Sequence, residues 1–242
     1  AGDALGIIGP SGSGKSTLAR ALVGVWRPPV GAGTIRLDGA SLDQWTPARL
    51  GRHIGYLPQD IQLFEGTVSE NIARLDPEAT DESIVAAAKA AGAHELIVGL
   101  RDGYQTRIGE NGGGLSAGQR QRIAFARALY GNPFMLVLDE PNSNLDAAGD
   151  AALSGAIKAV RERGGIVIVI AHRPSALANV DKVMAMADGK VQAFGPKEEV
   201  LRKVLAAVPS GPVTKGSNMP AQPEVNRVLR AVQTREERSE VI

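Results

Sequence analysis

The sequence near the start of the chain reads Gly9-Pro10-Ser11-Gly12-Ser13-Gly14-Lys15-Ser16-Thr17. Two glycines separated by four residues and followed by Lys and Ser have the spacing of a phosphate-binding loop, called the P-loop below. An apolar run, residues 4–8, precedes the loop, and a helical pattern over residues 15–25 follows it. Glycines let backbone N–H groups turn toward phosphate oxygens, and the following helix adds its positive N-terminal end. This stretch therefore predicts a nucleotide-binding α/β domain.

Two side chains of this loop have predicted roles at a bound nucleotide. Lys15 is expected to reach the β- and γ-phosphates, and Ser16 is expected to ligate Mg²⁺. The alternative is a Gly- and Ser-rich turn that binds nothing. The position of the loop between a strand and a helix argues against that alternative.

A second acidic pattern lies far along the chain. Four apolar residues, Met135 to Leu138, precede Asp139 and Glu140. A buried strand with this ending delivers carboxylates at its C-terminal end. We expect Asp139 to hold Mg²⁺ and Glu140 to polarise the attacking water as a general base. Many strands end in an acidic residue, so this pattern alone indicates little. Together with the P-loop it indicates the second half of a nucleotide site.

Strand and helix patterns alternate on both sides of a long helical block. Strands are predicted at residues 4–8, 34–37, 54–57, 134–138, 166–170, 182–187 and 190–194, and helices at residues 15–25, 147–163 and 196–205. Buried strands that alternate with helices indicate a mostly parallel sheet covered on both faces. The turn signal Asp38-Gly39 predicts a small antiparallel β-subdomain. The block at about residues 66–130 is predicted to be an inserted helical subdomain.

Composition narrows the class of protein further. The chain has 242 residues, 43% of them hydrophobic, a net charge of +1 and no cysteine. The near balance of charges argues against a domain built to hold nucleic acid, and the absence of cysteine excludes disulfides and thiolate metal sites. No stretch approaches the ~20 apolar residues of a membrane helix. The first residues do not resemble a signal peptide, and we expect the natural protein to start upstream of Ala1.

Further motifs follow in an order that resembles the ABC ATPases. Leu115-Ser116-Ala117-Gly118-Gln119 is similar to the signature motif, and Gln59 in Tyr56-Leu57-Pro58-Gln59 matches the Q-loop. Ser143-Asn144-Leu145-Asp146 matches the D-loop, and His172 matches the switch histidine. The resemblance covers about residues 1–205. Residues 206–242, which are first rich in Pro, Gly and Ser and then in mixed charges, are predicted to be a linker and tail.

The resemblance implies a P-loop NTPase fold, with ATP and Mg²⁺ as cofactors. In this family two ATPase domains are thought to close head-to-tail over two ATP molecules, so the P-loop of one copy would face the signature of the other. The implied catalytic residues are Lys15, Glu140 and His172, and the implied Mg²⁺ ligands are Ser16, Gln59 and Asp139. The implied nucleotide contacts are Gly9, Pro10, Ser11, Gly12, Ser13, Gly14, Lys15, Ser16, Thr17, Gln59, Ser116, Gly118, Gln119 and Asp146.

Physical chemistry alone also suggests a role for the signature segment. Ser116 is a suitable N-cap, and a helix that begins there offers free N–H groups to a γ-phosphate. An ordinary capped helix is the alternative. Ala117 replaces a usual glycine, and it would be strained if the position needed a positive φ; we expect that it does not. The family's adenine-stacking aromatic normally lies upstream of the P-loop, which places it outside this chain.

Three segments resemble exporters among the ABC ATPases. They are residues 63–72 after the Q-loop, residues 109–114 before the signature, and Glu140 to Asp146, which is closest to the branch that secretes proteases and lipases. The resemblance implies a bacterial type I protein secretion system at the cytoplasmic face of the inner membrane. Its implied partners are a second copy of the chain, a transmembrane domain of the same transporter, a periplasmic adaptor and an outer-membrane channel.

Two other functions remain open at this point. The first is an ABC-type ATPase of DNA maintenance, which would carry a long coiled-coil insertion that the sequence lacks and would bind DNA in a salt-sensitive way. The second is a nucleotide sensor that does not hydrolyse ATP. Such sensors tend to lose the base or the switch histidine, whereas Glu140 and His172 are both present.

Overall fold

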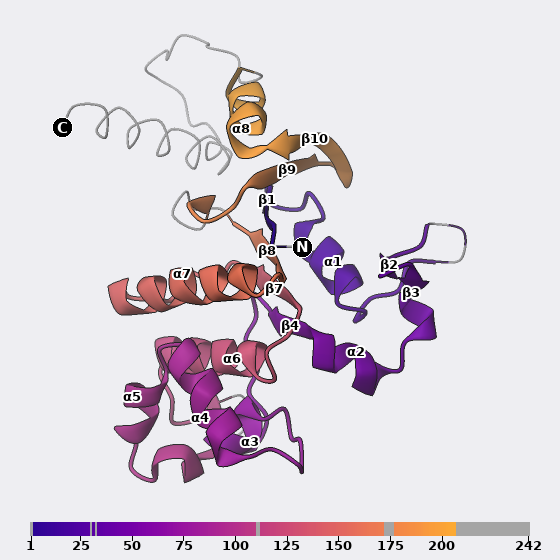
Figure 1. The fold of residues 1–242 in the computed structure, drawn as a ribbon. Helices are drawn as coiled ribbons and strands as arrows, with labels where there is room; N and C mark the ends of the chain where they lie inside the picture. Colours follow the sequence, from indigo (N-terminus) through magenta and orange to yellow (C-terminus); the bar gives the residue numbers. More distant parts are fainter. Residues whose placement is uncertain (1, 30, 32, 110–111, 172–176, 207–242) are drawn as a thin grey trace, which may run out of the picture.

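A six-stranded sheet forms the centre of the molecule in the computed structural model (Figure 1). The structure describes residues 2–29, 31, 33–109, 112–171 and 177–206. The strand order is β10-β9-β1-β8-β7-β4. Neighbouring strands from β9 to β4 are parallel, and β10 is antiparallel to β9 at the edge. The predicted mostly parallel α/β core is therefore confirmed.

The elements that build the sheet and cover it alternate along the chain. The strands of the large sheet are β1 (Ala4–Ile8), β4 (Ile54–Leu57), β7 (Met135–Asp139), β8 (Ile166–Ile170), β9 (Lys182–Ala187) and β10 (Lys190–Pro196). The helices are α1 (Lys15–Leu22), α2 (Pro47–His53), α3 (Val68–Ile72), α4 (Asp81–Ala90), α5 (His94–Val98), α6 (Ala117–Leu129), α7 (Ala147–Glu162) and α8 (Lys197–Ala206). Short 3₁₀ turns lie at Leu42–Gln44 and Gly103–Gln105.

Alternate residues of the central strands enter two separate apolar cores. In β7, Leu136 and Leu138 pack on the face covered by α6, α7 and α8, whereas Met135 and Val137 pack on the face covered by α1 and α2. The same alternation holds in β8. Side chains of a strand point to opposite faces in turn, so a strand that is apolar throughout must be covered on both sides. The central strands are therefore buried on both faces.

The helical block forms a lobe of its own at one end of the molecule, where α3 and α4 pack on α6 and α5 packs on α4 (Figure 1). Capping residues define its helices: Thr67 caps α3 and Thr80 caps α4 through side-chain oxygens. A two-stranded sheet of β5 (Gly66–Thr67) and β6 (Arg107–Ile108) joins the start of the block to the segment that precedes α6. The described part of residues 66–130 is thus mainly helical, as predicted.

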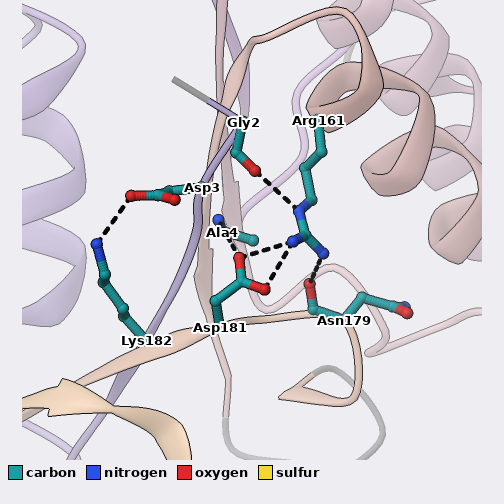
Figure 2. A network of polar contacts seen from close by, with 7 residues as sticks. All are labelled: Gly2, Asp3, Ala4, Arg161, Asn179, Asp181 and Lys182. Atoms are coloured by element: carbon teal, nitrogen blue, oxygen red, sulfur yellow. Dashed lines mark hydrogen bonds and ion pairs between the residues drawn. The ribbon is translucent and has the colours of Figure 1, made fainter.

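A polar network fixes the N-terminal strand to its neighbours (Figure 2). Arg161, in the last turn of α7, donates to both carboxylate oxygens of Asp181 at 2.6 and 2.8 Å and to the carbonyl of Gly2 at 3.1 Å. Asp181 also accepts from Ala4 N at 2.9 Å, and Lys182 pairs with Asp3. These bonds join α7, the start of β1 and the start of β9, and so hold the base of the strand that leads to the P-loop.

Several sequence predictions need correction. The first helix ends at Leu22 and not at Val25, because Gly24 has a φ of 78° and Val25 N bonds back to Arg20 O. Pro196 is the last residue of β10 and not the first turn of α8. The predicted small antiparallel sheet is present as β2 (Arg36–Leu37) and β3 (Ala40–Ser41), although its first strand begins two residues later than Thr34. Helix α2 was not predicted.

None of the helices in the described part of the chain combines the length and apolarity needed to span a bilayer.

Candidate nucleotide site

The candidate site lies at the edge of the sheet where the parallel strands end. Strand β1 leads into the P-loop, β4 into Gln59, and β7 into Glu140. Carboxyl ends of parallel strands meet at one edge of a sheet, and loops from that edge form the usual ligand crevice of open α/β folds. Parallel pairing therefore brings together residues that lie up to 130 positions apart in the sequence.

The amino group of Lys15 is held by the P-loop itself. Lys15 is 5% exposed. Its Nζ donates to the carbonyls of Gly9 at 2.9 Å and Pro10 at 2.8 Å. A positive charge is thus fixed inside the curve of the loop, where a phosphate chain would need it. The phosphate contact of Lys15 stays a prediction.

Glycine is required at the start of the loop by a close approach of two backbones. A Cβ added to Gly9 would lie 2.2 Å from the carbonyl oxygen of Met186 in β9, and the φ of Gly9 is 157°. Gly14 acts as the N-cap of α1 with a φ of 93°. Only glycine adopts both conformations without a steric cost. The loop is therefore seated against β9, and α1 starts directly behind it.

Asp139 is the residue best suited to hold a cation. Its carboxyl is 2% exposed, and Oδ1 has no hydrogen-bond partner. Burial raises the pKa of this carboxyl, whereas a hydrogen bond with the Ser16 hydroxyl lowers it. A buried, unsatisfied carboxylate oxygen beside a hydroxyl is costly unless a ligand completes it. Hard oxygen donors of this kind suit Mg²⁺, so the residues present fit the expected ion.

Glu140 has an unusual backbone conformation. Its φ is 53°, in the left-handed region that a glutamate rarely occupies. Such a conformation costs of order 1–3 kcal/mol and persists only where the surroundings hold it. Glu140 N donates to Ile170 O of β8 at 3.0 Å, and Ser143 N donates to Glu140 O at 3.3 Å. Strained residues of this kind concentrate at functional sites.

A cavity of about 200 Å³ brings the predicted residues together. Among the described residues it is lined by Ser11, Gly12, Gly14, Lys15, Ser16, Thr17, Gln59 and Glu140. The lining is mainly polar and combines loop backbone, one buried cation and one carboxylate. A phosphate chain with an attacking water beside Glu140 would suit such a lining. The P-loop, the Q-loop residue and the predicted base thus form one site.

The signature residues do not line this cavity. Ser116 is the exposed N-cap of α6, and it forms a capping box with Gln119: Gln119 N donates to Ser116 Oγ at 3.2 Å, and Ser116 N donates to Gln119 Oε1 at 2.8 Å. The predicted N-cap is confirmed. Ala117 is the first residue of the helix and has no positive φ, so the expectation that alanine fits here is also confirmed. A Cβ on Gly118 would lie 3.3 Å from Asn144 O, which leaves little room there.

Asp146 has partners within the same chain. Its side chain caps α7 by accepting from Gly149 N at 2.8 Å, and it pairs with Arg122 of α6. The bond from Gly149 N is the largest of the causes that lower the pKa of this carboxyl. Asp146 is not among the residues that line the cavity. His172 lies outside the described residues, as do residues 110–111 of the loop before the signature.

Sequence reasoning missed Gln121, a buried residue of α6. Its side chain is 1% exposed; its Nε2 donates to Pro141 O, and its Oε1 accepts from Asn144 N at 3.0 Å. The sequence contains a sign of this burial. Gln121 shares a helix face with Phe125 and Ala128, which are both buried, so a polar residue occupies the apolar face of α6. A buried amide in such a place needs specific partners.

The fold and this cavity define a P-loop nucleotide-binding domain. The model of the family described as ABC transporter matches residues 1–143 of the 242. The chain therefore belongs to the ABC transporter family, whose members bind ATP through such a domain.

Similar proteins refine the position within the family. Over 205 residues the chain is 64% identical to the "Type I secretion system ATP-binding protein PrsD" of Rhizobium meliloti (strain 1021). This alignment covers 85% of the chain and 35% of that protein. It is 43% identical over 200 residues to the "Toxin RTX-I translocation ATP-binding protein" of Actinobacillus pleuropneumoniae, at 83% and 28% coverage. The chain thus spans about a third of the length of these relatives.

A solved structure supports the same fold. It is described as "Structure of a bacterial Atm1-family ABC exporter with ATP bound". The TM-score is 0.77 at 32% sequence identity, and the match covers 98% of this chain and 37% of the other. The fold expected from the sequence, a P-loop domain of the ABC type, is therefore confirmed.

Proposed function

We propose that this chain is the Mg²⁺-dependent ATP-hydrolysing domain of a bacterial ABC exporter for type I protein secretion. One observation carries the catalytic part of the proposal: Lys15, Ser16, Gln59 and Glu140 line one cavity. The similarity to relatives named for secretion and toxin translocation supports the transport part. The same relatives make a role in DNA maintenance the weaker alternative.

Each side chain has a task in the proposed reaction. Lys15 neutralises charge on the β- and γ-phosphates from inside the P-loop. Glu140 accepts the proton of the attacking water, and its left-handed backbone presents the carboxylate to the cavity. Ser16, Asp139 and Gln59 would hold Mg²⁺, which would offset the negative charge of the phosphates. His172 completes the set as the proposed contact to the γ-phosphate.

A second copy of the chain supplies the rest of the proposed site. Ser116 is exposed, Gly118 and Gln119 are partly exposed, and all three lie apart from the cavity of their own chain. The N-terminal end of α6 carries free N–H groups that favour a phosphate. In a head-to-tail dimer these residues would face the nucleotide of the partner. Asp146, at the N-terminus of α7, would lie at the same dimer contact.

The remaining partners belong to the proposed transporter as a whole. A transmembrane domain would hold two copies at the cytoplasmic face of the bacterial inner membrane, and an adaptor and an outer-membrane channel would complete the export path. Residues 63–72 and 109–114, which resemble exporter segments, are the proposed contacts to the transmembrane domain.

Hydrolysis of ATP tests the catalytic proposal. The rate per chain is expected to rise with protein concentration and to require Mg²⁺, because two chains complete each site. Glu140→Gln should lower the rate by roughly 10²–10⁴-fold and trap an ATP-bound dimer in size-exclusion chromatography. Glu162→Gln, at an exposed position of α7, is the matched control and should keep the parent rate. Hydrolysis by Glu140→Gln at the parent rate would exclude Glu140 as the base.

A chimera tests the secretion proposal. This chain can replace the corresponding 205 residues of the Rhizobium meliloti relative, since the two are 64% identical there. The chimera is expected to restore export of polypeptides to the medium in cells that lack the relative, and the same chimera with Glu140→Gln should not. An active ATPase that fails to restore export would contradict the assignment to type I secretion but not the catalytic role.

A further inference from the structure

The turn that follows Glu140 needs a support that the catalytic residues do not supply. Glu140 occupies the left-handed region with a φ of 53°. Within the turn, the bond from Ser143 N to Glu140 O is long, at 3.3 Å. A conformation of this kind persists only if neighbouring groups hold it in place. Support comes from outside the turn: the bond from Glu140 N to Ile170 O of β8, at 3.0 Å, holds its start, and the residues that follow are held from α6.

Gln121 supplies such a support from α6. Its side-chain amide donates to Pro141 O, directly after Glu140, and accepts from Asn144 N at 3.0 Å. One buried side chain therefore binds both sides of the Glu140–Asn144 turn. Because the side chain is 1% exposed, water does not compete for these bonds.

The same face of α6 makes the neighbouring contacts. Gly118 and Arg122 are three residues before and one after Gln121, so Gly118, Gln121 and Arg122 lie at i, i+3 and i+4. Gly118 lies close to Asn144 O, and Arg122 pairs with Asp146. This face of α6 thus follows the turn from Pro141 to Asp146, with Gln121 at the end nearest Glu140.

We propose that Gln121 is a positioning residue for Glu140: it fixes the turn so that the carboxylate is held at the cavity that contains Lys15. This inference rests on the proposed function, since it assigns Glu140 as the base. Ser116, the N-cap of α6, faces the nucleotide of the partner in the proposed dimer. Gln121 therefore ties the base of one site to the signature that completes the other.

Two matched variants separate positioning from stability. Gln121→Met keeps the length of the side chain and removes both hydrogen bonds. Arg74→Met is the control, because Arg74 lies outside the cavity and outside the exporter segments, and its guanidinium donates to the carbonyls of Arg127 at 2.9 Å and Ala128 at 3.1 Å at the other end of α6. Both variants remove side-chain bonds to backbone groups, but only Gln121 contacts the turn after Glu140. Thermal unfolding of the 242-residue chain measures the stability loss of each variant.

The decisive readout separates kcat from ATP affinity. Gln121→Met is expected to lower kcat per folded chain by roughly 100-fold, the effect of a misplaced catalytic group, and to keep the Kd for ATP within about twofold. Arg74→Met should keep kcat per folded chain. In the Glu140→Gln background, Gln121→Met should lower the residual rate no further, because both changes affect the same group.

Two results would overturn the inference. The first is an unchanged kcat in Gln121→Met, and the second is a loss of ATP affinity that accounts for the whole loss of rate. A parent chain that binds ATP and does not hydrolyse it at any concentration would contradict the proposed function and this inference together. Failure of Gln121→Met alone, with an active parent chain, would contradict this inference only.

Discussion

The amino group of Lys15 donates a 2.9 Å hydrogen bond to the carbonyl of Gly9, the first residue of the same loop. Gly9 in turn lies so close to Met186 O of β9 that no side chain fits there. The position of the lysine charge is thus set by the seating of the loop on the sheet and not by the flexible side chain alone. Its fixed charge makes Lys15 the first target for mutation.

Lys15→Ala is expected to weaken ATP binding by roughly 10–100-fold, since a hydrogen bond to a charged group contributes about 1.5–3 kcal/mol. Isothermal titration with ATP and Mg²⁺ measures the change. Lys158→Ala, at an exposed position of α7, serves as the control for removal of a lysine and should bind ATP normally. Equal affinity in Lys15→Ala and the parent chain would refute the P-loop assignment.

Asp139→Asn is expected to raise the thermal stability of the chain at pH 7 in the absence of nucleotide and Mg²⁺. Burial raises the pKa of Asp139 above its value in the unfolded chain, so the ionised carboxylate opposes folding above the raised pKa. This cost falls as the pH drops through the raised pKa, and it is gone below the unfolded value. Each kcal/mol relieved corresponds to about 2–4 °C in Tm.

Melting curves of both proteins between pH 4 and pH 8 check this sign. The gap in Tm should be largest near neutral pH and should shrink toward pH 4. The same variant is expected to lose the stabilisation that Mg²⁺ with ATP gives the parent chain. A variant less stable than the parent at pH 7 would show that Asp139 contributes a structural bond stronger than its burial cost.

Arg161→Ala is expected to destabilise the chain by about 2 kcal/mol, because the Asp181 carboxylate and two backbone carbonyls lose their shared donor. Chemical denaturation measures the loss, and ATP affinity per folded chain should stay the same. Lys182→Ala, which removes only the exposed pair with Asp3, should have a small effect. An effect of Arg161→Ala as small as that of Lys182→Ala would mean that the bonds of Arg161 in Figure 2 do not support the fold.

Gly155→Ala is expected to stabilise the chain by roughly 0.5–1 kcal/mol. Gly155 is an exposed residue inside α7, its φ is not positive, and an added Cβ would meet nothing within 4 Å. Alanine at this position lowers the entropy of the unfolded chain without a clash. Gly9→Ala is the contrasting variant and should destabilise, because its Cβ would meet the backbone of β9. A loss of stability in Gly155→Ala, measured by denaturation, would contradict this account.

Sequence patterns predicted well those elements whose signals are local. Strands β1, β4, β8 and β9 have the predicted bounds, because each is a short apolar run with a glycine, a proline or a polar turn on at least one side. The N-cap Ser116 was also predicted, since the residues of its capping box, Ser116 to Gln119, are near neighbours in the sequence. Helix α2 was missed because Arg49, Gly51 and Arg52 break its apolar pattern, and Leu50 is its one buried residue.

The sequence by itself determined the class of the protein and the residues of the P-loop, because these depend on the spacing of neighbouring residues. It also indicated that Asp139 and Glu140 end a buried strand. The tertiary structure decided what those residues face. Contacts between distant segments bring Glu140 and Gln59 to Lys15. Such contacts also hold the left-handed φ of Glu140 and bind Gln121 to the turn that follows it. Such contacts form only when the sheet and α6 pack, so no local pattern contains them.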